Sequence, residues 1–126
     1  MKTILLIEDH DLMRMFLVNF IGKDHQVYSV KSPQEAVDWL RIANVDLILS
    51  DYPSSSHLKN QMIALQASAY EKEIPMMILT DEDKSEQRIQ AFYWGAKDSL
   101  SKPFNPVELK IRIKNQLLIN TAIKGK

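Results

Sequence analysis

The sequence predicts an α/β fold in which five parallel strands form one doubly wound sheet flanked by five helices. Five short apolar runs alternate along the chain with five segments of helical spacing. Parallel strands need crossover connections, so this alternation is typical of a parallel sheet with right-handed crossovers and helices on both faces. Residues 4–7 and 47–49 are unbroken apolar runs, which indicates strands buried on both sides.

The first strand is expected over residues 3–7 and runs into the acids Glu8 and Asp9. The helix that follows, over residues 12–21, has a fitting stop in Gly22 and an apolar face that we expect to pack on the sheet. That face consists of Leu12, Met13, Phe16, Leu17 and Phe20.

A second strand over residues 26–30 leads into a helix with a strong start signal. Ser32 fits the N-cap, Pro33 the first turn, and Glu35 completes a capping box. The apolar stripe of this helix is expected to be Ala36, Val37, Trp39, Leu40 and Ala43.

The third and fourth strands are expected over residues 46–50 and 75–79, with a helix over residues 59–70 between them. Each is a short apolar run that ends in a polar side chain. The third strand runs into Asp51 and the fourth into Thr80.

The last part of the chain repeats the pattern. The acidic run 81–83 suits the N-terminus of a helix through Trp94, because acids there interact favourably with the helix dipole. A fifth strand follows over residues 98–101, and an Asn-Pro start at Asn105 begins a last helix that reaches about residue 119.

Length and composition exclude several classes of protein. With 126 residues the chain is expected to form one domain over residues 1–126. Its 16 Lys and Arg balance its 16 Asp and Glu, so we expect no direct contact with nucleic acid or an anionic membrane. The absence of Cys excludes disulfides and thiolate metal sites and suits a cytoplasmic protein. No apolar run approaches the ~18 residues of a membrane span, and we expect no signal peptide.

Polar side chains follow four of the predicted strands at the point where each strand ends. They are Glu8 and Asp9, Asp51, Thr80, and Lys102. The carboxyl ends of parallel strands meet at one edge of the sheet, where such folds gather their chemistry. Taken alone, Asp51 also fits a helix N-cap or a solvated turn, and the other strand ends favour a functional role.

Together, these side chains could form one reactive site. Neighbouring carboxylates repel one another and favour a bound cation, for which Mg²⁺ with its preference for oxygen ligands is the expected cofactor. The expected ligands are Glu8, Asp9, Asp51 and the carbonyl group of Pro53. Lys102 adds a compact positive charge and Thr80 a hydroxyl group. Together they are typical of phosphoryl transfer, with Asp51 as the nucleophile that forms an aspartyl phosphate.

The chain resembles the receiver domains of two-component response regulators over residues 2–120. The resemblance rests, in this order and spacing, on Glu8-Asp9, Asp51, Thr80, Gly95-Ala96 and Lys102-Pro103-Phe104. It implies a flavodoxin-like sheet of strand order 2-1-3-4-5, Mg²⁺ dependence and a cis peptide bond before Pro103. It also implies a signalling module, not an enzyme, whose Asp51 is phosphorylated by a sensor histidine kinase or a phosphotransfer protein.

Four positions depart from the family pattern. Ser55 and Lys59 stand where the family usually has Pro and Gly, so the loop over residues 52–57 is expected to take a different path. Asp81 takes the place of a small residue and brings negative charge toward the phosphoryl site. Ser99 replaces the usual aromatic residue, so we expect a shallower conformational switch.

Proteins of this fold can also have other functions. A flavin or nucleotide binder needs a first loop whose N–H groups cradle phosphate, and Glu8 and Asp9 would repel phosphate. A phosphatase needs a general acid just after Asp51, and the sequence has none there. A degenerate receiver that docks a partner without being phosphorylated stays open as the alternative, favoured by the altered loop, Asp81 and Ser99.

The last helix carries two apolar stripes. The stripe expected to face the sheet is Leu109, Ile113 and Leu117. A second stripe, roughly 100° or more away, consists of Val107, Ile111 and Leu118. With Tyr93 and Trp94, this second stripe predicts a surface on the fourth helix, fifth strand and final helix for a homodimer or an output segment. The alternative is a wide buried face.

Overall fold

The computed structural model describes residues 1–81 and 84–124, with side chains as far as Ile119. The strands are β1 (Thr3–Ile7), β2 (Gln26–Val30), β3 (Leu47–Asp51), β4 (Met76–Thr80) and β5 (Asp98–Ser101). The helices are α1 (Asp11–Ile21), α2 (Pro33–Leu40), α3 (Ser56–Glu71), α4 (Ser85–Tyr93) and α5 (Pro106–Lys124). None of the described helices combines the length and the apolar character needed to cross a membrane.

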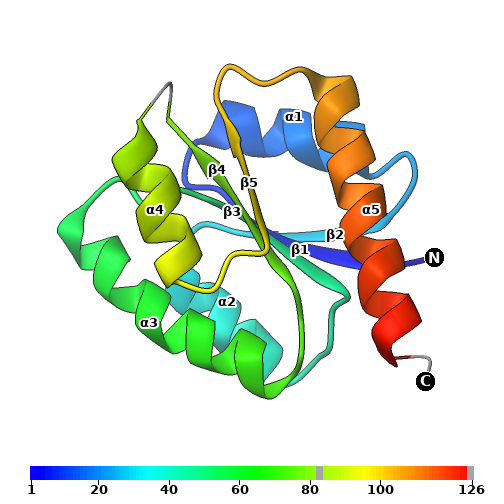
Figure 1. Ribbon diagram of the computed structural model, residues 1–126, viewed down its shortest axis with the longest axis horizontal. Helices are drawn as coiled ribbons and strands as arrows, with labels where there is room; N and C mark the ends of the chain where they lie inside the picture. The colour runs from blue at the N-terminus through cyan, green and yellow to red at the C-terminus, as the bar shows by residue number, and fades with distance from the viewer. Residues whose placement is uncertain (82–83, 125–126) are drawn as a thin grey trace.

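The five strands form one parallel sheet in the order β2-β1-β3-β4-β5, which confirms the doubly wound, flavodoxin-like topology. Helices α1 and α5 cover one face of the sheet, and α2, α3 and α4 cover the other (Figure 1). The order places β1, β3 and β4 in the middle, side by side. Their carboxyl ends therefore meet at one edge, as the predicted site requires.

The central strands are buried on both faces, as their unbroken apolar runs predicted. Leu5 and Ile7 of β1 pack with residues of α2, α3 and α4, whereas Ile4 and Leu6 pack with residues of α1 and α5. All four side chains are at most 3% exposed. Close packing on both sides holds the strand ends, and the polar residues that follow them, in fixed positions.

Serine side chains set the start of two helices. The Ser32 hydroxyl accepts a hydrogen bond from the Glu35 N–H (3.2 Å), which confirms the predicted start of α2. Helix α3 begins at Ser56, earlier than predicted, because the Ser55 hydroxyl accepts a hydrogen bond from the Leu58 N–H (3.2 Å) and caps the first turn.

Parts of two predicted helix faces are wrong. In α1, Leu12 is 80% exposed and Phe16 is 44% exposed, while Leu17 and Ile21 are buried. The register of the helix turns the pair Leu17 and Ile21, four residues apart, onto the sheet and leaves the neighbouring pair at the surface. Ala43 lies outside α2, which ends at Leu40.

The two stripes of the last helix are confirmed. The stripe against the sheet is at most 5% exposed and consists of Leu109, Ile113 and Leu117. The second stripe is 54–62% exposed and consists of Val107, Ile111 and Leu118. A single wide buried face is therefore wrong. Tyr93 is 76% exposed, but Trp94 is buried, so Trp94 is not part of the predicted surface.

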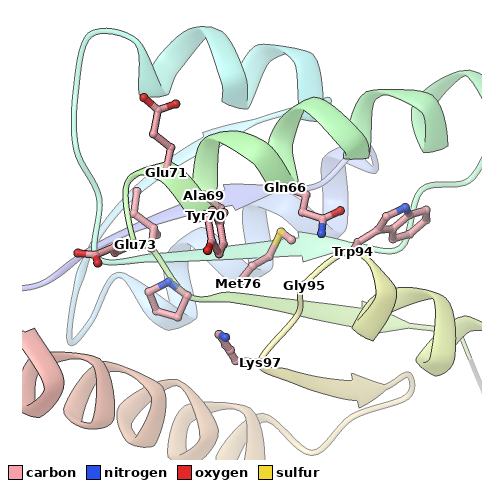
Figure 2. A pocket seen from close by; sticks show the side chains of 11 residues that line it. Gln66, Ala69, Tyr70, Glu71, Glu73, Met76, Trp94, Gly95 and Lys97 are labelled. Carbon is pink, nitrogen blue, oxygen red and sulfur yellow. The ribbon is translucent and has the colours of Figure 1, made fainter.

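A cavity of about 550 Å³ opens at the edge of the sheet opposite the polar strand ends. It lies between the end of α3, the start of β4 and the connection from α4 to β5 (Figure 2). Glu73 on its rim has a φ of 57°, and Gly95 at the corresponding end of α4 has a φ of 87°. This left-handed conformation commonly ends helices, and glycine usually occupies it because a Cβ atom is strained there.

Glu73→Gly is expected to raise the free energy of unfolding by roughly 0.5–1 kcal/mol, because glycine enters the left-handed region without that strain. Urea unfolding measures the change. Glu73→Gln is the matched control, because it keeps the Cβ atom and removes only the charge, and it should unfold like the wild type. An unchanged or lower stability of Glu73→Gly would show that the Glu73 side chain makes a compensating interaction.

Candidate functional site

The structure brings the polar residues at the strand ends to one edge of the sheet. Asp51 is the last residue of β3, which ends one residue later than predicted, and Thr80 is the last residue of β4. Glu8 directly follows β1, and Lys102 directly follows β5. The Lys102 N–H donates to the Thr80 carbonyl (2.9 Å), and the Tyr52 N–H donates to a carbonyl of β4 (2.8 Å). Backbone hydrogen bonds therefore fix the three neighbouring strand ends relative to one another.

Lys102 is the centre of the charge arrangement. Its Nζ donates a hydrogen bond to Oδ1 of Asp51 and lies 3.9 Å from Oε1 of Glu8. The side chains of Lys102 and Asp51 are 23% and 21% exposed, so water screens this ion pair less than a pair on the open surface. The Lys102–Pro103 peptide bond is cis, as the resemblance implied.

Glu8 is a buried acid with one unpaired oxygen. Only 2% of the residue is exposed, and Oε2 accepts a hydrogen bond from the His10 N–H (3.1 Å), but Oε1 has no hydrogen-bond partner among the described residues and only the more distant charge of Lys102 near it. Burial, and then the charge of Asp51, raise the pKa of Glu8. Burial also raises the pKa of Asp51, opposed by its hydrogen bond with Lys102. The site therefore carries more negative charge than Lys102 alone offsets.

Glu8→Gln is expected to stabilise the metal-free protein at neutral pH by about 1 kcal/mol, because Gln fills the same space without the negative charge that burial and Asp51 disfavour. The pKa of Glu8 is higher in the folded protein than in the unfolded chain, so stability falls as the pH rises above the ordinary value of 4.5. Gln removes this loss. Urea unfolding in EDTA between about pH 4 and pH 7 measures the difference, which should shrink toward the acidic end. An equal gain in unfolding free energy at about pH 4 and pH 7 would contradict the raised pKa of Glu8.

A small cavity lies beside Asp51. Its volume is about 20 Å³, and its lining includes Asp9, Asp51 and Pro53 but not Glu8. This is room for one water-sized species. The described residues contain no group of three or more His, Cys, Asp or Glu side chains that is arranged to hold a metal by itself. A metal ion here would depend on one or two carboxylates, the Pro53 carbonyl and waters.

The Thr80 hydroxyl group forms a hydrogen bond with Ser101 and not with Asp51. Its Oγ1 lies 3.2 Å from Oγ of Ser101, and either oxygen can be the donor. Thr80 is completely buried. The structure therefore places Thr80 at the predicted edge, with its hydroxyl held on the β5 side.

Asp81 is held against α4. Its N–H donates to Oε1 of Gln87 (2.7 Å), and its Oδ2 accepts from Nε2 of Gln87 (2.9 Å). Burial, and then the charge of Asp81, raise the pKa of the Tyr52 phenol, so the Asp81 charge still acts on the residue next to the candidate nucleophile. The predicted interaction of Glu82 and Asp83 with the dipole of the following helix lies outside the described residues.

Most of the chain matches a known family of signalling domains. A family model described as the response regulator receiver domain matches residues 4–114. The chain belongs to this family. The match covers the five strands except for the first residue of β1, and it includes the polar residues at the strand ends, so this is a receiver domain of the kind found in two-component systems.

Relatives of this receiver domain occur in regulators and in kinases. It is 33% identical over 117 residues to the phosphate regulon transcriptional regulatory protein PhoB of Klebsiella pneumoniae, covering 90% of this chain and 50% of that protein. It is 27% identical over 126 residues to Histidine kinase P4 of Formosa agariphila, covering 99% of this chain and 9% of the kinase. The receiver domain thus spans half or less of these relatives.

Solved structures agree with the family. A putative response regulator from Chloroflexus aurantiacus superposes with a TM-score of 0.81 at 27% identity, covering 93% of this chain and 98% of that chain. The signal receiver domain of a putative Luxo repressor protein from Vibrio parahaemolyticus has a TM-score of 0.82 at 18% identity, which supports the fold alone.

The sequence did not predict three residues of the receiver domain that contribute to this site, namely Arg14, Tyr52 and Ser101. Arg14 Nη1 donates to the Glu8 carbonyl (3.0 Å), and the Tyr52 ring packs on Trp94 with centroids 5.4 Å apart. These two contacts depend on tertiary packing and leave no sequence pattern. The third residue, Ser101, is the register partner of Thr80, so the predicted parallel order of the last two strands contained its signal.

Proposed function

We propose that this receiver domain accepts a phosphoryl group on Asp51 from a sensor histidine kinase or a phosphotransfer protein. The Asp51–Lys102 ion pair at the meeting point of the strand ends carries the proposal. An Asp51 oxygen attacks the phosphorus of a phosphohistidine, the P–N bond breaks, and the imidazole leaves with the electron pair and takes up a proton. The product is an aspartyl phosphate that carries roughly −2 charge in place of the carboxylate.

Lys102 and Thr80 have complementary parts in this proposal. Lys102 already contacts Asp51, so its ammonium group offsets charge on the phosphoryl oxygens without prior rearrangement. Thr80, at the end of the neighbouring strand, offers a hydroxyl that can turn toward a phosphoryl oxygen. Rotation of the Thr80 side chain would transmit phosphorylation at the end of β3 to the contacts between β4 and β5.

The residues present fit a Mg²⁺ ion, which we propose as the cofactor. Asp9, Asp51 and Pro53 border a cavity with room for one small species, to which Pro53 would contribute its carbonyl group, and Glu8 would assist with Oε1 through a bound water. Mg²⁺ usually takes one or two carboxylates and keeps several waters, so the site needs no cluster of three acids. When bound, the ion would offset the charge of the acids and of the phosphoryl group.

A module that docks its partner without phosphorylation is the second candidate. The negative charge of Asp81 and the missing aromatic side chain at Ser99 favour it. Against it, Asp81 is held by Gln87, and Lys102 lies beside Glu8 and Asp51 at the strand ends. Both candidates are signalling modules that act by binding a partner.

Intact-mass measurement after incubation with acetyl phosphate tests phosphoryl acceptance. The wild type should gain the mass of one phosphoryl group with Mg²⁺ present and far less in EDTA. The same measurement with a competent histidine kinase extends the test to the physiological class of donor. A wild type that gains no phosphoryl group from either donor would contradict the proposal and favour the docking module.

We also propose that residues 1–126 act as one domain in the cytoplasm, without direct contact to nucleic acid. The neutral net charge and the absence of Cys support this placement.

The exposed face of α4, β5 and α5 is proposed as the partner surface, for a homodimer or an output segment. Six apolar side chains on it are more than half exposed, which is typical of interaction sites. They are Ile89, Phe92, Tyr93, Val107, Ile111 and Leu118.

Tyr93→Glu combined with Ile111→Glu is expected to weaken this association and to leave the fold intact, because both side chains are exposed. Light scattering with and without a phosphoryl mimic measures the mass in solution. Ile63→Glu combined with Tyr70→Glu on α3 is a matched control of similar exposure. If the wild type stays monomeric throughout and both double variants bind the physiological partner equally well, the surface is not the one used.

A further inference from the structure

The hydroxyl groups of Thr80 and Ser101 form a pair at the ends of β4 and β5. Parallel pairing places the two residues directly opposite each other, and their oxygens lie 3.2 Å apart. Thr80 is completely buried, so water cannot replace a lost partner, and an unpaired hydroxyl there would be costly. In the part of the chain that the structure describes, Ser101 is the side-chain partner of the Thr80 hydroxyl.

The backbone on both sides of Thr80 is fixed. On the β5 side, the Lys102 N–H donates to the Thr80 carbonyl, and on the β3 side, the Tyr52 N–H donates to the Leu79 carbonyl. The Thr80 hydroxyl therefore moves by rotation about χ1 from one staggered position to another, without a shift of the strand. That rotation breaks the hydrogen bond with Ser101 whichever oxygen is the donor.

Ser99 and Ser101 share one face of β5, because side chains alternate along a strand. It is the face on which β5 meets Thr80, and it presents two small hydroxyl side chains. Since Ser99 supplies no aromatic ring that could follow Thr80, the neighbouring Ser101 hydroxyl is the group on β5 that responds first when Thr80 turns.

We propose that Ser101 is a positioning residue that holds Thr80 in its resting orientation. Exchange of the Ser101–Thr80 hydrogen bond for one between Thr80 and a phosphoryl oxygen is then the switching step of this domain. The inference rests on the proposed phosphorylation of Asp51. Removing the Ser101 hydroxyl leaves Thr80 without a partner in the resting state only, because Thr80 bonds the phosphoryl group in the switched state. Ser101 therefore sets how readily the domain switches.

Binding of beryllium trifluoride with Mg²⁺, which mimics a phosphoryl group on a carboxylate, tests this role. Ser101→Ala should bind the mimic about three- to tenfold more tightly than the wild type, as expected for the loss of one hydrogen bond from the resting state. Urea unfolding of the same variant without the mimic should show lower stability. Ser101→Thr keeps the hydroxyl group and should restore wild-type affinity. Equal or weaker binding of the mimic by Ser101→Ala would overturn the proposal.

Thr80→Val provides the matched background, because it removes the hydroxyl at the other end of the pair. In this background Ser101→Ala should no longer change the affinity for the mimic, and an undiminished effect there would also overturn the role of Ser101. A wild type that binds no mimic contradicts phosphoryl acceptance at Asp51, whereas binding by the wild type with unchanged affinity in Ser101→Ala contradicts the role of Ser101 alone.

Discussion

Asp51→Asn is expected to gain no phosphoryl group, because an amide oxygen cannot act as the nucleophile that forms an acyl phosphate. The fold should persist, since Asn has nearly the same volume and removes a charge that burial disfavours, as the raised pKa of Asp51 indicates. Intact-mass measurement detects whether a phosphoryl group is gained, and urea unfolding checks that the variant is folded. Asp38→Asn, at an exposed acid of α2, is the control and should be phosphorylated like the wild type. Phosphorylation of Asp51→Asn at the wild-type rate would place the acceptor elsewhere.

Lys102→Ala is expected to lower the rate of phosphorylation about a hundredfold, the effect of removing one preorganised group that stabilises developing charge. Lys102 is the cation bonded to Asp51, so its loss leaves the phosphoryl oxygens without their fixed positive charge. The rate of phosphoryl incorporation from acetyl phosphate measures the effect. Lys97→Ala is the matched control, because Lys97 lines the cavity at the opposite edge of the sheet. A rate unchanged by Lys102→Ala would show that the ion pair serves stability only.

Local signals predicted the order and type of the elements. Unbroken apolar runs marked the buried strands, and Ser32 with Glu35 marked the start of α2. The inner face of α1 was harder, because apolar residues surround much of that helix. Only contact with the sheet decides that Leu17, and not Leu12, is buried. The left-handed conformation of Glu73 was equally inaccessible, because residue preference alone would place glycine there.

For the site, too, the sequence predicted the positions of the residues but not their contacts. The rule that chemistry gathers at the carboxyl ends of parallel strands placed Asp51, Thr80 and Lys102 at one edge from strand order alone. It did not assign partners to their side chains. Lys102 bonds to Asp51 and lies farther from Glu8, and the Thr80 hydroxyl pairs with Ser101. These choices depend on rotamers and burial, which sequence spacing does not determine.

Reduction with borohydride tests most directly that Asp51 is the phosphoacceptor. An aspartyl phosphate is an acyl phosphate, and borohydride reduces it to homoserine, which peptide mass spectrometry then locates. After treatment of the wild type with acetyl phosphate and Mg²⁺, we expect homoserine at position 51 and no reduction at Glu8 or Asp9. An unreduced Asp51 in protein that has gained a phosphoryl group, or reduction at a different acid, would contradict the assignment.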